Sequence, residues 1–213
     1  MANAAAPFGL RPSHNITGAA YNGQVRLYRI PSTDTVAYSV GDVVTEVAGG
    51  DVKTGVSDVA LYGTRGNTST SGNVRGVIVG FATATGNVGG DTAIVGGDPD
   101  APSLMIIPAT KTKAYYVFVC DDPNMIYEAQ TNTLASTAFN KNTGLAVGAA
   151  PTAASPNCKT IVDGANATTT STLPIKIVGA PNRIDNDLTS PGTNAYIWVM
   201  LNTNDLTSPS LGV

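Results

Sequence analysis

The sequence predicts an all-β protein, a β-sandwich or barrel of jelly-roll type with long loops. Three observations predict this fold class. Residues that favour helix interiors are scarce, and Glu46 and Glu128 are the only glutamates among 15 acidic residues. Glycine and proline, which favour turns, number 23 and 13 in a chain of 213 residues. Short runs of β-branched and aromatic residues recur between these turn residues, as is typical of strands.

The N-terminal residues 1–20 are predicted to form an extended arm. They have no hydrophobic period and contain Pro7, Gly9, Pro12 and Gly18, so we expect them to become ordered only by docking on another surface. Residues 21–213 are predicted to form the β-rich body. Within it, residues 86–102 are rich in glycine, proline and aspartate, which predicts either a boundary between two β subdomains or a projecting loop.

Each predicted strand is a β-branched, aromatic or alternating run bounded by turn residues. The first alternates polar and apolar residues and is closed by Pro31, and the run at 114–120 is apolar enough to be central. One helical turn is predicted within residues 133–139, and residues 63–73 are too polar to be more than a surface loop. In order, the strands lie within residues 24–30, 36–47, 56–62, 74–83, 104–107, 114–120, 125–130, 159–162, 173–178 and 196–202.

Charge and hydropathy exclude two classes of function. The 12 basic residues form no stripe that would neutralise phosphates, so nucleic-acid binding is not expected. The most apolar run, residues 115–120, is far shorter than the roughly 20 residues of a spanning helix, so we expect no membrane insertion. The N-terminus has neither the charged nor the apolar region of a signal peptide, which predicts a soluble protein made in the cytoplasm.

The residues that could carry catalysis or bind a metal are few. His14 is the only histidine and lies in the arm, where nothing would position it as a general base. With Cys120 and Cys158 as the only cysteines, one chain does not assemble a zinc site, and both are expected to be reduced thiols. Cys120 ends an apolar run and is predicted to be buried, whereas Cys158 lies in a polar loop and is predicted to be exposed. We also expect Trp198 to be buried.

Paired aspartates are the remaining candidates, and we interpret them as turn residues. Asp and Asn side chains cap their own backbone in tight turns. Adjacent residues at a strand end point to opposite sides, so such a pair is poorly placed to share a proton. We therefore predict no catalytic residue, no metal and no cofactor. The pairs are Asp98 and Asp100, Asp121 and Asp122, and Asp185 and Asp187.

Three segments resemble one group of tailed-bacteriophage virion proteins, the capsid decoration or cement proteins. The first is the N-terminal run Ala2–Pro12 with its Pro-Phe-Gly-Leu-Arg-Pro box, followed by Tyr21-Asn22-Gly23. The others are residues 119–128 and residues 173–178 with 182–186. The resemblance implies a protein made in the host cytoplasm that binds the outer face of the shell, as a homotrimer on the major capsid protein.

The resemblance also implies which residues of the arm contact the shell. The arm pairs apolar side chains with one arginine, so it would offer an apolar anchor and a charge-assisted hydrogen bond. The expected contact residues are Pro7, Phe8, Leu10 and Arg11. Deleting residues 2–12 is then expected to leave a folded trimer that no longer binds expanded heads.

Two other functions stay open. One is a tail-tube or head–tail joining protein, which would assemble as hexameric rings. The other is a virion-associated module that binds or hydrolyses carbohydrate, with Asp98 and Asp100 as its carboxylates. A hydrolase needs a carboxyl group in an apolar cleft, and these two lie in a glycine-rich loop, so the second alternative is the weaker one.

Overall fold

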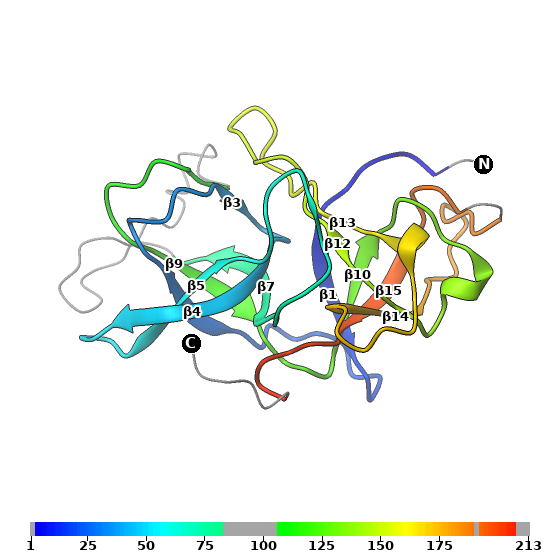
Figure 1. Cartoon of the computed structure of the whole chain (residues 1–213), viewed down its shortest axis with the longest axis horizontal. Coiled ribbons are helices and arrows are strands. Elements are labelled where there is room, and N and C mark those ends of the chain that lie inside the picture. Colours follow the sequence, from blue (N-terminus) through cyan, green and yellow to red (C-terminus); the bar gives the residue numbers. More distant parts are fainter. Residues whose placement is uncertain (1–2, 83–105, 190–191, 208–213) are drawn as a thin grey trace.

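A computed structural model describes residues 3–82, 106–189 and 192–207 of the chain. The protein is nearly all β, with 41% of its residues in strands and 3% in helix, which confirms the predicted fold class. Figure 1 shows two β assemblies side by side, and the chain crosses between them more than once.

The first assembly is a closed barrel. Its strands are β2 (Arg26–Ile30), β4 (Val43–Asp51), β5 (Val56–Leu61), β7 (Gly76–Phe81) and β9 (Tyr115–Cys120), in the order β2-β5-β4-β7-β9. All neighbouring pairs are antiparallel except β2 with β5. Strand β9 lies between β7 and β2, which confirms the prediction of a central strand. Its alternation is visible in the burial of Val117 and Val119, both 0% exposed, against 37% for Phe118 between them.

The second assembly is an open antiparallel sheet. It contains β1 (Leu10–Asn15), β10 (Met125–Gln130), β15 (Tyr196–Leu201), β14 (Ile175–Gly179) and β11 (Asn142–Thr143), in the order β1-β10-β15-β14-β11. Strand β15 alternates, with Ile197 and Val199 in the core. Trp198 points the other way and is only half-buried, so the prediction that it is buried was wrong. Its ring packs edge-on against that of His14, with 5.2 Å between the ring centroids.

Two smaller sheets are built from short strands. Strand β3 (Tyr38–Ser39) pairs with β8 (Ile106–Ile107), and β12 (Leu145–Ala146) lies between β13 (Ile161–Val162) and β6 (Thr68–Ser69). The helical turn predicted within residues 133–139 is present as the 3₁₀ turn η2 (Ser136–Ala138), and a second such turn is η3 (Gly164–Asn166). A barrel joined to an open sheet differs from a jelly roll, whose eight strands form two facing sheets.

The chain passes from the barrel to the sheet between β9 and β10. Residues 121–124 make this connection through a turn in which the Met125 N–H donates to the carbonyl of Asp122 at 3.1 Å. Residues 86–102, where the sequence predicts either a boundary between β subdomains or a projecting loop, come earlier in the chain. Those residues lie outside the described ranges, and β9, which follows them, still belongs to the barrel. One hydrophobic cluster contains side chains of both assemblies, so they share a core.

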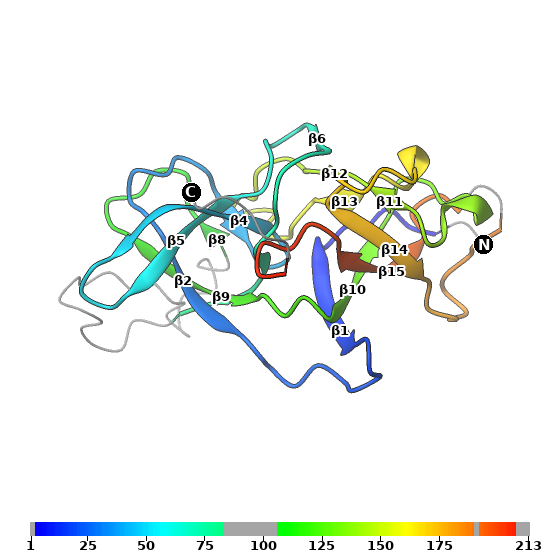
Figure 2. The ribbon, with the colours of Figure 1, turned by 60° about the horizontal axis from the view of Figure 1, so that its bottom comes forward.

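The N-terminal segment docks on the chain's own sheet. Strand β1 pairs with β10 from Leu10↔Ala129 to Asn15↔Met125, and Leu10 is only 1% exposed. Before it, Gln130 accepts a hydrogen bond from the Ala6 N–H at 3.0 Å and donates one to the Ala4 carbonyl at 2.8 Å. Figure 2 shows β1 beside β10 at the edge of the sheet. The surface that orders these residues is therefore the body itself, and they form part of it.

Residues 39–42 form a turn, here called the 39–42 turn, that joins β1 to the barrel. Gly41 donates its N–H to the Ile78 carbonyl at 2.8 Å and accepts the Leu10 N–H at 3.0 Å. Gly41 has a φ of +96°, and a Cβ there would lie 2.2 Å from the carbonyl oxygen of Phe8. Gly9 meets the same limit, because its Cβ would lie 2.2 Å from the Gly41 oxygen. The N-terminal segment can approach the 39–42 turn this closely because both Gly9 and Gly41 lack a Cβ.

We expect Gly41→Ala to destabilise the protein by more than the same change at Gly18. Both glycines have positive φ, but a Cβ at Gly18 meets nothing within 4 Å, so Gly18→Ala has only the backbone cost of about 1–2 kcal/mol. Gly41→Ala adds a clash with backbone atoms, worth about 1–3 kcal/mol more. Denaturant unfolding of both variants measures the difference, and equal losses would show that the close approach is unimportant.

Candidate functional site: a groove between barrel and sheet

A cavity of about 740 Å³ lies where the N-terminal segment faces the barrel. One wall is made by Phe8 and β1. The opposite wall is made by β7 and the 39–42 turn. A loop from residues 156–158 closes one side. We call this cavity the junction groove. Its lining residues are Phe8, Leu10, Arg11, Pro12, Tyr21, Val40, Gly41, Ile78, Val79, Phe81, Pro156, Asn157 and Cys158.

The described lining of the junction groove is mostly apolar, and Arg11 is the only charged residue among those described. Val40 is 46% exposed, although a valine at a turn gains nothing from contact with water. Leu10 and Ile78 form the buried floor, at 1% and 0% exposure. An apolar concave surface with one charged group at its edge has the chemistry of a binding site for a largely apolar segment.

The edge of the groove is held by a cluster of two aromatic rings and three charged side chains. The rings of Phe8 and Tyr196 stack with centroids 6.0 Å apart, and the Arg11 guanidinium lies 4.9 Å from the Phe8 centroid. Glu128 pairs with Arg11 at 3.1 Å and with Arg183 at 2.8 Å. This cluster holds Phe8 and Arg11 in place on the folded body.

The structure therefore brings together three of the four residues expected to contact the shell. Phe8 and Arg11 stand at the edge of the junction groove, and Leu10 forms part of its floor. Pro7 is half-buried and does not line the groove. The residues that sequence reasoning missed are Val40 and Phe81. They come from the barrel, and no local pattern in the sequence indicates that they lie opposite the N-terminal box.

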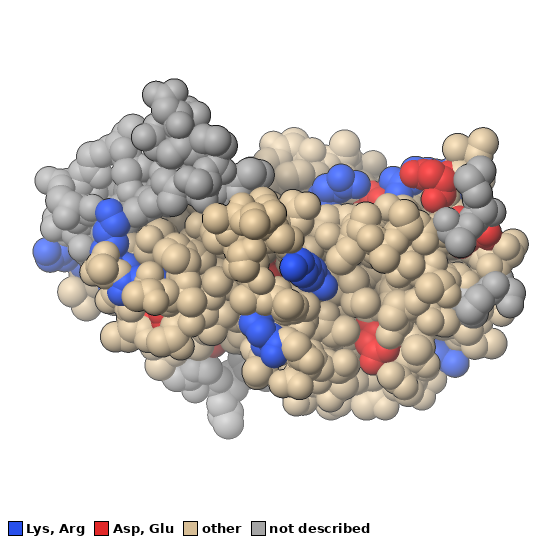
Figure 3. Space-filling view, turned by 90° about the horizontal axis from the view of Figure 1, so that it is seen from above, with Lys and Arg blue, Asp and Glu red and all other residues tan. Residues whose placement is uncertain are grey.

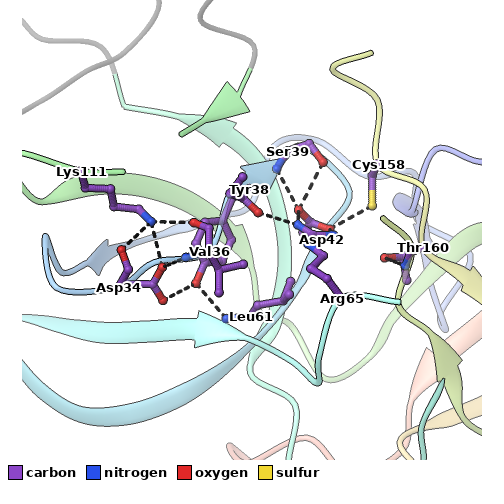
Figure 4. Close-up of polar contacts among 12 residues, drawn as sticks. Asp34, Val36, Tyr38, Ser39, Asp42, Leu61, Arg65, Lys111, Cys158 and Thr160 are labelled. Carbon is purple, nitrogen blue, oxygen red and sulfur yellow. Dashed lines mark hydrogen bonds and ion pairs between the residues drawn. The ribbon is translucent and has the colours of Figure 1, made fainter. Parts of the chain in front are cut away.

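A buried carboxylate supports the groove from behind (Figure 4). Asp42 is 0% exposed, and its Oδ2 accepts the backbone N–H of Ser39 at 2.8 Å, which closes the 39–42 turn. Arg65 binds it through both oxygens, at 2.9 Å to Oδ1 and 2.6 Å to Oδ2. The Cys158 thiol donates to Oδ1 at 3.1 Å. One carboxylate thus fixes the turn and ties the 156–158 loop to it.

A second buried ion pair holds the segment that leads into the turn. The Lys111 side chain is 0% exposed, and its Nζ donates to Asp34 Oδ1 at 2.8 Å and to the Val36 carbonyl at 2.6 Å. The Tyr38 hydroxyl donates to Asp34 Oδ2 at 2.8 Å and accepts the Leu61 N–H at 3.0 Å. Burial raises the pKa of Tyr38, so its hydroxyl keeps the proton that it donates. Figure 4 shows this pair beside the Asp42 group, and Arg65 links the two because its Nη2 also donates to the Ala37 carbonyl at 2.7 Å.

Both cysteines are buried free thiols. This agrees with the prediction for Cys120, but the prediction that Cys158 is exposed was wrong. The loop of Cys158 is polar in sequence, yet its side chain turns inward to Asp42 and is only 1% exposed. Burial, and then the charge of Asp42, raise the pKa of the Cys158 thiol to about 12.

The aspartate pairs cap turns or bind separate partners. Asp121 accepts the Tyr28 hydroxyl at 2.7 Å, whereas Asp122 accepts the Asn15 amide at 3.0 Å. Asp187 accepts the Thr189 N–H at 2.8 Å, and Asp185 pairs with Arg183. Asp98 and Asp100 lie outside the described residues. Among the residues that the structure describes, no three His, Cys, Asp or Glu side chains are grouped as a metal site.

Comparisons with protein-family models, curated proteins and solved structures found no match to this chain. In the described ranges, no helix is both long enough and apolar enough to cross a membrane.

We expect Arg65→Met to destabilise the protein by about 3–5 kcal/mol, because it leaves the buried Asp42 carboxylate without its main partner. Arg26→Met is the matched control. It removes an arginine paired with Asp121 at 3.3 Å, but the Arg26 side chain is 64% exposed, so the loss should be below about 1 kcal/mol. Denaturant unfolding measures both variants. A small loss for Arg65→Met would contradict the role of the pair.

The raised pKa of the Cys158 thiol predicts that the folded protein loses stability at alkaline pH. Its folded pKa of about 12 lies above the usual thiol value of 9.0, so between these values the unfolded chain releases a proton that the folded chain keeps. Stability should then fall as pH rises from about 9 to 12, by at most about 1.4 kcal/mol per pH unit. Cys158→Ser keeps a hydroxyl donor that does not ionise in this range. The unfolding free energy of the variant should therefore fall less steeply, and identical slopes would refute the assignment.

Proposed function

We propose that this chain is a structural virion protein that binds and stabilises the outer face of a phage capsid as a homotrimer, without a cofactor. The observation that carries the proposal is the junction groove, because it presents Phe8 and Arg11 of the N-terminal box beside the exposed Val40 and the half-buried Val79 and Phe81. The resemblance of the sequence to decoration proteins supplies the class of partner, the major capsid protein.

The surface chemistry supports the same function. Only 13% of the residues are charged, and in Figure 3 the lysine, arginine, aspartate and glutamate side chains are separated by wide areas of other residues. A surface with few charges loses little hydration energy when it is covered. Close packing on a neighbouring subunit is therefore inexpensive for this protein.

The proposal requires no detachable arm. Phe8 and Arg11 are presented on the folded body, whereas Leu10 is part of the core. Deletion of residues 2–12 would remove the buried Leu10 and the Gly9–Gly41 contact, so we now expect it to damage the fold. Loss of capsid binding after that deletion would not identify a contact.

The test mixes the purified full chain with expanded heads assembled from the major capsid protein of the same phage. We expect the chain to sediment with the heads at a fixed ratio and to raise the temperature at which they rupture, with trimers visible on the shell by electron microscopy. Heads that pellet without the chain would overturn the proposal. Rings with six-fold symmetry would favour a tail-tube or joining role, and release of sugars from cell-wall polysaccharide would favour the carbohydrate module.

A further inference from the structure

The ladder that joins β4 to β7 in the closed barrel is short, and it ends beside the junction groove. Strand β4 pairs with β7 only at Val43↔Val77 and Val44↔Gly76, although β7 continues to Phe81. The N–H and carbonyl of Ile78 are used by Asp42 and Gly41 of the 39–42 turn. From Val79 to Phe81, β7 is paired with β9 on one edge, and no described strand pairs with its other edge. This short free edge carries backbone groups that can pair with a further strand.

The free edge faces the junction groove, because Ile78, Val79 and Phe81 all line it. The opposite wall offers no comparable edge. In β1, the Leu10 N–H is bound to Gly41, Pro12 has no N–H, and the Ser13 carbonyl accepts the Tyr21 N–H at 3.0 Å. An extended segment in the groove would therefore pair with β7 and only pack against β1.

Charge selects what kind of segment fits. Of the lining residues in the described part of the chain, Arg11 alone is charged, and its side chain is 61% exposed. Its described partner, Glu128, does not line the groove and is shared with Arg183, so one carboxylate faces two guanidinium groups. The guanidinium has five N–H donors in a planar fork, and the contact with Glu128 uses Nη2 alone. An acidic side chain on the incoming segment would complete this site.

We propose that the junction groove receives an extended segment of a capsid subunit as an added strand beside residues 79–81. Its backbone pairs with the free edge of β7, apolar side chains on alternate residues enter the groove, and one acidic side chain binds Arg11. Strand addition gives affinity through main-chain hydrogen bonds and specificity through pockets for alternate side chains. The cavity of about 740 Å³ has the volume needed for a few such side chains. This inference depends on the proposed function, since it names the partner's chemistry.

The test compares two matched substitutions, Val40→Glu and Val52→Glu, for binding of the full chain to expanded heads. Val40 lines the groove, and Val52 lies in the connection between β4 and β5 at 98% exposure. We expect Val40→Glu to weaken binding by about ten-fold or more, because it places a carboxylate in an apolar site built for an acidic segment. Val52→Glu should stay within about two-fold of the original chain. Arg11→Gln should also weaken binding and provides a second variant if Val40→Glu does not fold.

A peptide array identifies the occupant directly. Overlapping peptides of the major capsid protein are probed with the full chain, and the best peptide is then remade with alternate backbone amides N-methylated. Strand addition predicts one apolar segment with an acidic residue, whose binding is lost on N-methylation and weakened by Arg11→Gln. Binding that survives N-methylation on both alternations would overturn the strand pairing.

The outcomes separate this inference from the proposed function. If the chain binds heads and Val40→Glu binds equally well, the groove assignment is wrong and the capsid-binding function stands. If the original chain does not bind heads, both fail. If Val40→Glu converts an oligomer into a monomer in light scattering and leaves binding to heads unchanged, the groove receives a second copy of this chain, which overturns the inference.

Discussion

The buried carboxylate of Asp42 is the group on which the rest of the structure depends. It has no contact with water, so its charge must be met by Arg65, by the Ser39 N–H and by the Cys158 thiol. Those contacts fix the 39–42 turn, which includes Gly41. Through its two backbone groups, Gly41 joins β1 of the sheet to β7 of the barrel. This ion pair thereby fixes one of the points at which the two assemblies meet.

The same arrangement creates the junction groove. Its walls belong to different assemblies. The 39–42 turn bonds to β1 at Leu10 and to β7 at Ile78, and beyond these bonds the two walls stand apart. Beyond that point β7 continues without a partner from β4, so the groove has an apolar lining and a backbone edge that no described strand pairs with. The described lining residues already hold their positions in the folded chain, which reduces the entropy lost on association.

Sequence reasoning found part of this site. The N-terminal box was identified through a resemblance, and the structure places Phe8, Leu10 and Arg11 around one groove. The barrel residues of the groove were missed, because Val40 and Phe81 are distant from the box in sequence and no periodicity connects them. Cys158 was wrongly placed at the surface for a related reason. Its neighbours are polar, and only the long-range contact with Asp42 explains why its thiol is buried.

The sequence by itself determined the all-β class, most strand positions and the short helical turn near residue 136. These properties follow from composition and from alternation within a few residues. The tertiary structure alone decided which strands pair, that β2, β4, β5, β7 and β9 close into a barrel, and that the N-terminal segment is a strand of the body. Strands pair through backbone groups that every residue has, so these groups do not identify the partner strand. The partner is determined by which side chains, distant in sequence, are buried together. A Cβ at Gly9 or at Gly41 would lie 2.2 Å from a carbonyl oxygen of the facing segment, which shows how closely the two segments pack.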